Sequence, residues 1–66
     1  MMLQDAFDLF RRLGVHPEMI SRPEFSAAYH GLARRFHPDV NPATYELMAN
    51  LNAARTTILQ SYRRPS

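Results

Sequence analysis

A short segment with two prolines sets the points at which helices in this chain can end and begin. It spans residues 36–42 and reads FHPDVNP. Pro38 has no backbone N–H and disfavours helical geometry at the preceding residue, so a helix arriving from the N-terminal side must end near Phe36. A new helix can begin at Asn41 and Pro42, because asparagine is a good N-cap and proline suits the first helical position. The residues between are predicted to form a short, stiff, exposed loop, and such loops suit recognition.

Apolar residues at helical spacing predict three helices, over residues 3–13, 22–36 and 42–60. No segment shows the alternating pattern of a β-strand. Helices joined by a short polar loop usually pack antiparallel. We therefore expect an all-α fold in which the second and third helices form an antiparallel hairpin and the first packs across it. The residues predicted to line the core are Leu3, Phe7, Phe10, Leu13, Phe25, Ala28, Tyr29, Leu32, Phe36, Leu47, Met48, Leu51, Ala54 and Ile58.

Local signals mark the ends of the first two helices. Gly14 follows the first apolar stripe and suits the position just after a helix end. Ser21 and Glu24 have the spacing of a capping box, in which each side chain bonds the other residue's backbone N–H. Ile20 and Phe25 occupy the two positions of a hydrophobic staple. These signals predict the start of the second helix more sharply than any other boundary.

The composition indicates one small domain over residues 1–66. Hydrophobic residues make up 45% of the chain, which is enough for a helical core. The absence of cysteine excludes disulfides and thiolate metal sites. No apolar run approaches the ~20 residues of a membrane span, and Asp5 and Asp8 interrupt the place where a signal peptide would need apolar residues. We therefore expect a soluble, cytoplasmic protein that does not associate with membranes.

The charge of the chain is modestly basic. All eight basic residues are arginines, and the formal net charge is +2. Arginine suits bidentate contacts with carboxylates and phosphates. The net charge is nevertheless too small to indicate nucleic acid as a partner by itself. On the third predicted helix, Asn52 and Arg55 fall on the side expected to face solvent.

Three segments together carry a family resemblance. Residues 13–15 read LGV, residues 28–39 read AYHGLARRFHPD and residues 51–54 read LNAA. With these segments in this order the chain resembles the J domain, the module of DnaJ-type co-chaperones. A lone His-Pro-Asp tripeptide is weak evidence, but here it follows Tyr-x-x-Leu-Ala-x-x-Phe and lies between two predicted helices. The resemblance covers nearly the whole chain and implies a J-domain-like helical bundle.

The resemblance also implies a function. J domains bind the ATP-bound form of DnaK-type heat-shock chaperones and stimulate ATP hydrolysis by the chaperone, without performing chemistry themselves. They do so through the loop and the helix before it. The residues expected to bind the partner are His37, Pro38, Asp39, Arg34, Arg35, His30 and Tyr29. No catalytic residue, cofactor or metal ion is expected, and we expect the protein to act as a monomer.

The chain departs from the family pattern on the exposed face of the second predicted helix, where J domains usually carry several basic residues. The matching positions hold Ser26, Ala27, His30 and Gly31. Only Arg34 and Arg35 remain, close to the loop, so weak electrostatic attraction to an acidic partner is expected. Most of the family's usual fourth helix also has no counterpart in this sequence.

Simpler structural interpretations exist for some of these residues. His30 can be an ordinary solvated residue of a helix. Arg34 and Arg35 can simply complement the dipole at the helix end. Tyr29 can pack in the core with its hydroxyl at the edge.

Two other functions remain open at the level of sequence. The chain can be a J-like scaffold that binds the ATPase weakly or competes with active co-chaperones. It can also be a small helical DNA-binding protein, although its second predicted helix lacks a basic stripe. An enzyme is not expected, because no nucleophile or glycine-rich phosphate loop accompanies His37 and Asp39.

Overall fold

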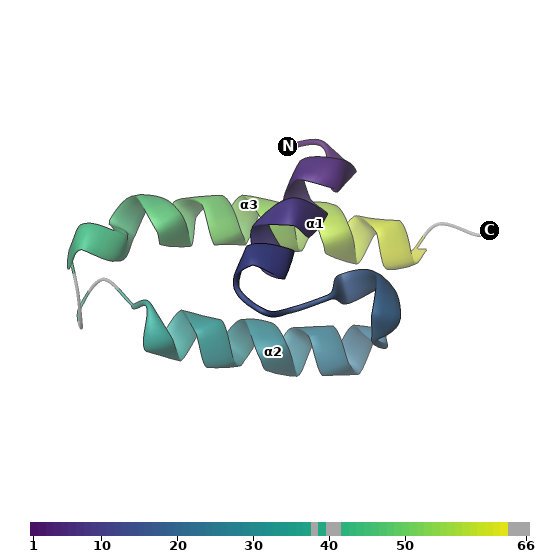
Figure 1. Ribbon diagram of the computed structural model, residues 1–66, viewed down its shortest axis with the longest axis horizontal. Helices are drawn as coiled ribbons and strands as arrows, with labels where there is room; N and C mark the ends of the chain where they lie inside the picture. The colour runs from purple at the N-terminus through teal and green to yellow at the C-terminus, as the bar shows by residue number, and fades with distance from the viewer. Residues whose placement is uncertain (38, 40–41, 64–66) are drawn as a thin grey trace.

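The computed structural model describes residues 1–37, 39 and 42–63. Within them the helices are α1 (Leu3–Arg12), α2 (Arg22–Arg35) and α3 (Tyr45–Arg63), with two 3₁₀ turns, η1 (Pro17–Met19) and η2 (Pro42–Thr44). These described residues contain no strand. The helices α2 and α3 run in opposite directions as a hairpin, and α1 crosses α3 (Figure 1). The predicted all-α architecture is confirmed.

The predicted bounds of the third helix are wrong at both ends. The segment 42–44 forms a separate 3₁₀ turn, and the α-helix begins at Tyr45 and continues to Arg63. It extends beyond residue 60 because Tyr62, in its last turn, is held against the start of α2, as described below. The first two helices end one residue earlier than predicted, with Leu13 and Phe36 as their C-caps. The predicted N-cap Asn41 lies outside the described residues.

The end of α1 is closed by Gly14, as the sequence predicts. The backbone N–H of Val15 donates to the carbonyl of Phe10, and that of Gly14 donates to the carbonyl of Arg11, each at 3.0 Å. These two bonds form a Schellman motif, which satisfies carbonyls that the helix leaves open. Gly14 has a φ of 86°, a left-handed conformation that side chains disfavour. The chain therefore turns sharply away from α1 towards η1.

The start of α2 is fixed by the predicted capping box. The backbone N–H of Glu24 donates to Ser21 Oγ at 3.3 Å, and the backbone N–H of Ser21 donates to Glu24 Oε1 at 3.1 Å. Ile20, the residue before the cap, packs against the core cluster that contains Phe25, as a hydrophobic staple requires. These contacts set the angle at which the chain enters α2.

The three helices meet in a cluster of aromatic rings. Phe10 of α1 packs edge-on against Phe25 of α2, with ring centroids 5.0 Å apart and planes at 69°. Tyr62 of α3 lies 6.2 Å from Phe25 on a tilted plane. Edge-to-face pairs of this kind add to the stabilisation from burial alone. The fully enclosed or nearly enclosed hydrophobic residues are Ala6, Phe10, Phe25, Leu32, Met48, Leu51, Ala54 and Ile58.

Tyr62 also ties the end of α3 to the start of α2. Its hydroxyl lies 2.8 Å from the carbonyl oxygen of Pro17 and 3.1 Å from that of Ile20. Both carbonyls belong to the segment that links α1 to α2. Partial burial raises the pKa of the Tyr62 hydroxyl, which keeps it in the protonated form that donates. The last turn of α3 is therefore anchored by contacts with residues far away in the sequence.

Leu51 is predicted to be among the positions most sensitive to truncation. It is fully buried at the middle of α3. We expect Leu51→Ala to lower the free energy of unfolding by about 2–5 kcal/mol, because it leaves a cavity in a core with few alternative contacts. Met19→Ala is the matched control, since Met19 is 79% exposed and should change stability by less than ~0.5 kcal/mol. Chemical denaturation measures both; equal losses would contradict the position of Leu51 in the core.

The capping box predicts an acid-sensitive component of stability. The hydrogen bond from the Ser21 side chain, with that from its backbone, lowers the pKa of Glu24 below 4.5. A lowered folded-state pKa gives stability that is present above the ordinary pKa and is lost as the pH falls through the folded value. Glu24→Gln keeps a capping side chain without the charge. The melting temperature of this variant should therefore fall less than that of the wild-type protein between pH ~5 and pH ~3. Thermal unfolding measures both proteins, and an equal fall in melting temperature for the two would rule out this contribution.

Candidate functional site

His37 and Asp39 lie at the tip of the hairpin, just beyond Phe36, the C-cap of α2. The backbone N–H of Asp39 donates to His37 Nδ1 at 3.1 Å. Asp39 Oδ2 lies 3.6 Å from the same nitrogen, and the two side chains are 93% and 54% exposed. Because Nδ1 accepts this bond, the neutral ring carries its proton on Nε2. The tip therefore presents a carboxylate and an imidazole to solvent. Pro38, the third predicted residue of this segment, lies outside the described residues.

The base of this loop is held by contacts between α2 and η2. The backbone N–H of Phe36 donates to the carbonyl of Leu32 at 2.9 Å. The carbonyl of Phe36 accepts a hydrogen bond from the hydroxyl of Thr44. This second bond joins the last turn of α2 to the turn that precedes α3. The described residues before and after the loop are therefore joined directly, and His37 follows Phe36 on the α2 side.

Tyr29 links α2 to α3. Its side chain is half-buried, and its hydroxyl donates to Asn52 Oδ1 on α3. The guanidinium of Arg55 lies over its ring, 5.0 Å from the centroid, at a distance typical of a cation–π contact. The ring of the exposed His30 meets it at an angle, with centroids 5.8 Å apart. Tyr29 thus serves the packing of the hairpin, while His30 beside it faces solvent.

The two arginines near the loop lie on different sides of α2. Both are exposed and belong to the last turn of the helix, where positive charge complements the dipole. Arg34 follows His30 by four residues and shares its side of the helix. The guanidinium of Arg35 lies 5.3 Å from the centroid of the Phe36 ring. His30 and Arg34 therefore share one side of α2 by their spacing, and Arg35 is turned away from that side.

Asn52 and Arg55, which apolar periodicity places on the solvent side of the third helix, are part of this contact between α2 and α3. Arg55 is half-buried, and both side chains contact Tyr29. Their spacing of three residues puts them on one side of α3, which is a signal present in the sequence. The pairing with Tyr29 could not be read from it, because α2 and α3 can align in several registers.

Metal-ligating side chains do not gather elsewhere in the part of the chain that the structure describes. Over residues 1–37, 39 and 42–63, no three side chains of histidine, cysteine, aspartate or glutamate come close enough to hold an ion together. None of the helices in these same ranges has the length and apolar character needed to cross a bilayer.

Comparisons with known proteins found no relative of this chain. No protein-family model, curated protein or solved structure matches the chain. The resemblance to J domains therefore rests on the sequence segments that carry it, with an arrangement of helices that is compatible with it.

Proposed function

We propose that this chain is a J domain that binds the ATP-bound form of a DnaK-type chaperone and stimulates its ATP hydrolysis. The observation that carries the proposal is the exposed pair of His37 and Asp39 at the tip of an antiparallel hairpin, directly after a helix that reads AYHGLARRF. In this role the protein performs no bond-breaking chemistry and acts by binding. The proposal implies a cytoplasmic location, where the partner's ATP is available.

Asp39 is the residue proposed to contact the partner most directly. The Asp39 side chain is 93% exposed, and its Oδ2 lies 3.6 Å from Nδ1 of the His37 ring. An exposed carboxylate on a short loop can accept charge-assisted hydrogen bonds from an arginine of the partner. The bond from the Thr44 hydroxyl to the Phe36 carbonyl joins the two ends of the segment that carries Asp39.

Stimulation of hydrolysis requires preferential binding to one state of the chaperone. A ligand shifts a conformational equilibrium only by the difference between its affinities for the two states. A hundredfold increase in the hydrolysing state needs a difference of about 2.7 kcal/mol. One hydrogen bond to a charged group contributes about 1.5–3 kcal/mol, so the Asp39 contact alone is of the required size if the resting state lacks it.

His37 is proposed to act mainly by orienting Asp39. Its Nδ1 accepts the backbone N–H of Asp39 at 3.1 Å, which restrains the backbone beside the carboxylate. Its Nε2–H lies on the opposite side of the ring from that bond and can donate to the partner. Substitution of His37 by glutamine should therefore reduce stimulation nearly as much as loss of the Asp39 charge.

We predict that Asp39→Asn abolishes most of the stimulation without unfolding the protein. The variant keeps the shape of the side chain and removes its charge. Loss of a charged hydrogen bond should reduce the stimulated rate constant roughly 10- to 150-fold, the equivalent of about 1.5–3 kcal/mol. An exposed loop residue should change stability by less than ~0.5 kcal/mol. Single-turnover ATP hydrolysis by a DnaK-type chaperone and thermal unfolding, measured together, test both parts.

Asp5→Asn is the control for this experiment. It makes the same change of charge and shape at an exposed position of α1, far along the chain from the loop. It should leave the stimulation unchanged. Equal stimulation by wild type and Asp39→Asn would contradict the assignment of the loop. Binding to the chaperone without any stimulation would instead identify a competing scaffold, and tight binding of duplex DNA would favour the nucleic-acid alternative.

A further inference from the structure

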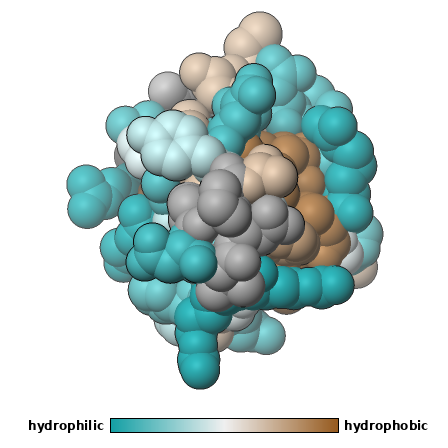
Figure 2. Space-filling view, turned by 90° about the vertical axis from the view of Figure 1, so that its left-hand side faces the viewer, coloured by the Kyte–Doolittle hydropathy of each residue, from teal (hydrophilic) through white to brown (hydrophobic). Residues whose placement is uncertain are grey.

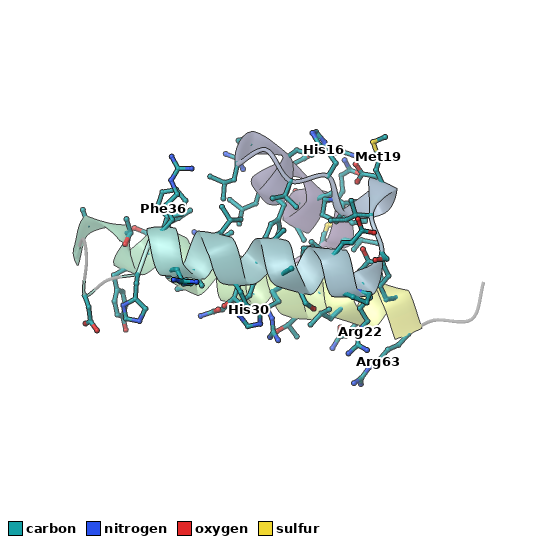
Figure 3. All side chains as sticks on the ribbon, turned by 90° about the horizontal axis from the view of Figure 1, so that it is seen from below. His16, Met19, Arg22, His30, Phe36 and Arg63 are labelled. Carbon is teal, nitrogen blue, oxygen red and sulfur yellow. The ribbon has the colours of Figure 1, made fainter. Side chains whose placement is uncertain are left out.

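The turn that links α1 to α2 carries a histidine and a methionine on one side. The 3₁₀ turn η1 has His16 as its N-cap and Met19 as its last residue. The backbone N–H of Met19 donates to the carbonyl of His16 at 3.0 Å. Residues three apart eclipse one another in a 3₁₀ turn. Figure 3 shows both side chains projecting from the same side of the molecule, opposite His30. The turn therefore presents an imidazole and a thioether together.

Neither of these two side chains packs into the core. Met19 is 79% exposed, although methionine is one of the residue types most often buried. His16 is exposed, and its side chain forms no capping hydrogen bond with the turn. The sulfur and the ring nitrogens are therefore accessible from solvent, and both side chains can rotate without disturbing the fold.

The backbone that carries them is held at several points. Pro17 is fully buried. The hydroxyl of Tyr62 donates to the carbonyls of Pro17 and Ile20, which lie on either side of the turn's last two residues. Arg11 Nε donates to Glu18 Oε1 at 3.1 Å, and Arg11 Nη2 lies 3.0 Å from Glu18 Oε2. A ligand bound by this turn therefore has to order two side chains and little backbone.

We propose that His16 and Met19 form a binding site for a soft monovalent metal ion, copper(I). Thioether sulfur selects copper(I), and imidazole nitrogen binds copper as well. Monovalent ions of this kind accept two ligands, so the site differs from clusters of three histidine, cysteine, aspartate or glutamate side chains, which the described residues lack. The methionine side chain has three rotatable bonds, which let its sulfur adjust to an ion held on the imidazole.

The surroundings of the turn favour a soft ion over a hard one. The nearest carboxylate along the turn is that of Glu18, and both of its oxygens are engaged by Arg11. Magnesium and calcium need several oxygen ligands, and zinc takes four ligands, with sulfur supplied as thiolate. The chain has no cysteine, so no thiolate competes with the thioether for a soft ion.

The combination of the two ligand types distinguishes η1 from the other methionines. Met48 is nearly enclosed in the core. Met1 and Met2 border a hollow against α3, and its lining residues include no histidine. The histidine His30 packs against the Tyr29 ring on the other side of the hairpin. A soft ion added to the protein should therefore occupy η1 first.

The test is titration of the protein with silver(I), which shares the charge and the ligand preference of copper(I) and is not oxidised in air. NMR in chloride-free buffer should show the Met19 methyl and His16 ring signals shifting first and reaching a plateau at a single equivalent. The variants are His16→Gln and Met19→Leu, and the matched controls are His30→Gln and Met2→Leu. Because each variant loses one of two linked ligands, its dissociation constant should rise roughly 100-fold, whereas the controls should bind like wild type.

Several results would overturn the proposal. One is a parallel shift of the Met1, Met2 and Met19 methyl signals, and another is wild-type affinity in both variants. Tighter binding of zinc(II) than of silver(I) would exclude a soft-ion site.

Thermal unfolding supplies a second readout. Without silver, the exposed variants should melt with the wild-type protein. Silver should raise the melting temperature of wild type and controls but not of the variants, because it binds the folded turn. A melting temperature that falls with silver would overturn the proposal. None of these measurements involves a chaperone, so they stand or fall independently of the proposed function.

Discussion

The packing of Phe10 against Phe25 and Tyr62 places one aromatic ring from each helix in a single cluster. These rings pack with aliphatic core residues, among them Leu51 and Ile58, so the cluster joins all three helices within one core. The aromatic cluster lies near the end of the hairpin where α1 and η1 meet α2.

The opposite end carries the loop, with His37 and Asp39 exposed. Figure 2 shows that tip from its own side, with hydrophilic surface around an apolar area. Folding and the proposed binding therefore depend on different ends of the molecule.

Much of the fold follows from local signals in the sequence. The capping box of Ser21 and Glu24 and the turn at Gly14 act within a few residues, and the structure contains both. The extent of α3 could not be predicted in the same way. It is fixed by bonds from the Tyr62 hydroxyl to carbonyls 45 and 42 residues away, and by Thr44, whose hydroxyl reaches back to Phe36. Such contacts depend on packing between helices, which apolar periodicity does not specify.

In the candidate site, too, some features follow from local sequence signals and others depend on packing between helices. The exposure of His37 and Asp39 was predictable from the sequence, because a proline at position 38 disfavours a helix through these residues. The contacts of Tyr29 with Asn52 and Arg55 depend on the register of α2 against α3 and were missed. That register also sets which side chains of the two helices share a side of the hairpin, and Figure 3 shows Arg22 of α2 and Arg63 of α3 projecting from the same side.

In the proposed role, the chain is a binding module whose loop favours one state of an ATPase partner. The most direct test is single-turnover hydrolysis of ATP bound to a DnaK-type chaperone, with increasing concentrations of the wild-type protein. The account predicts that the hydrolysis rate constant rises with concentration and saturates, because binding shifts a two-state equilibrium of the chaperone. A rate constant that stays at its basal value while the protein demonstrably occupies the chaperone would contradict it.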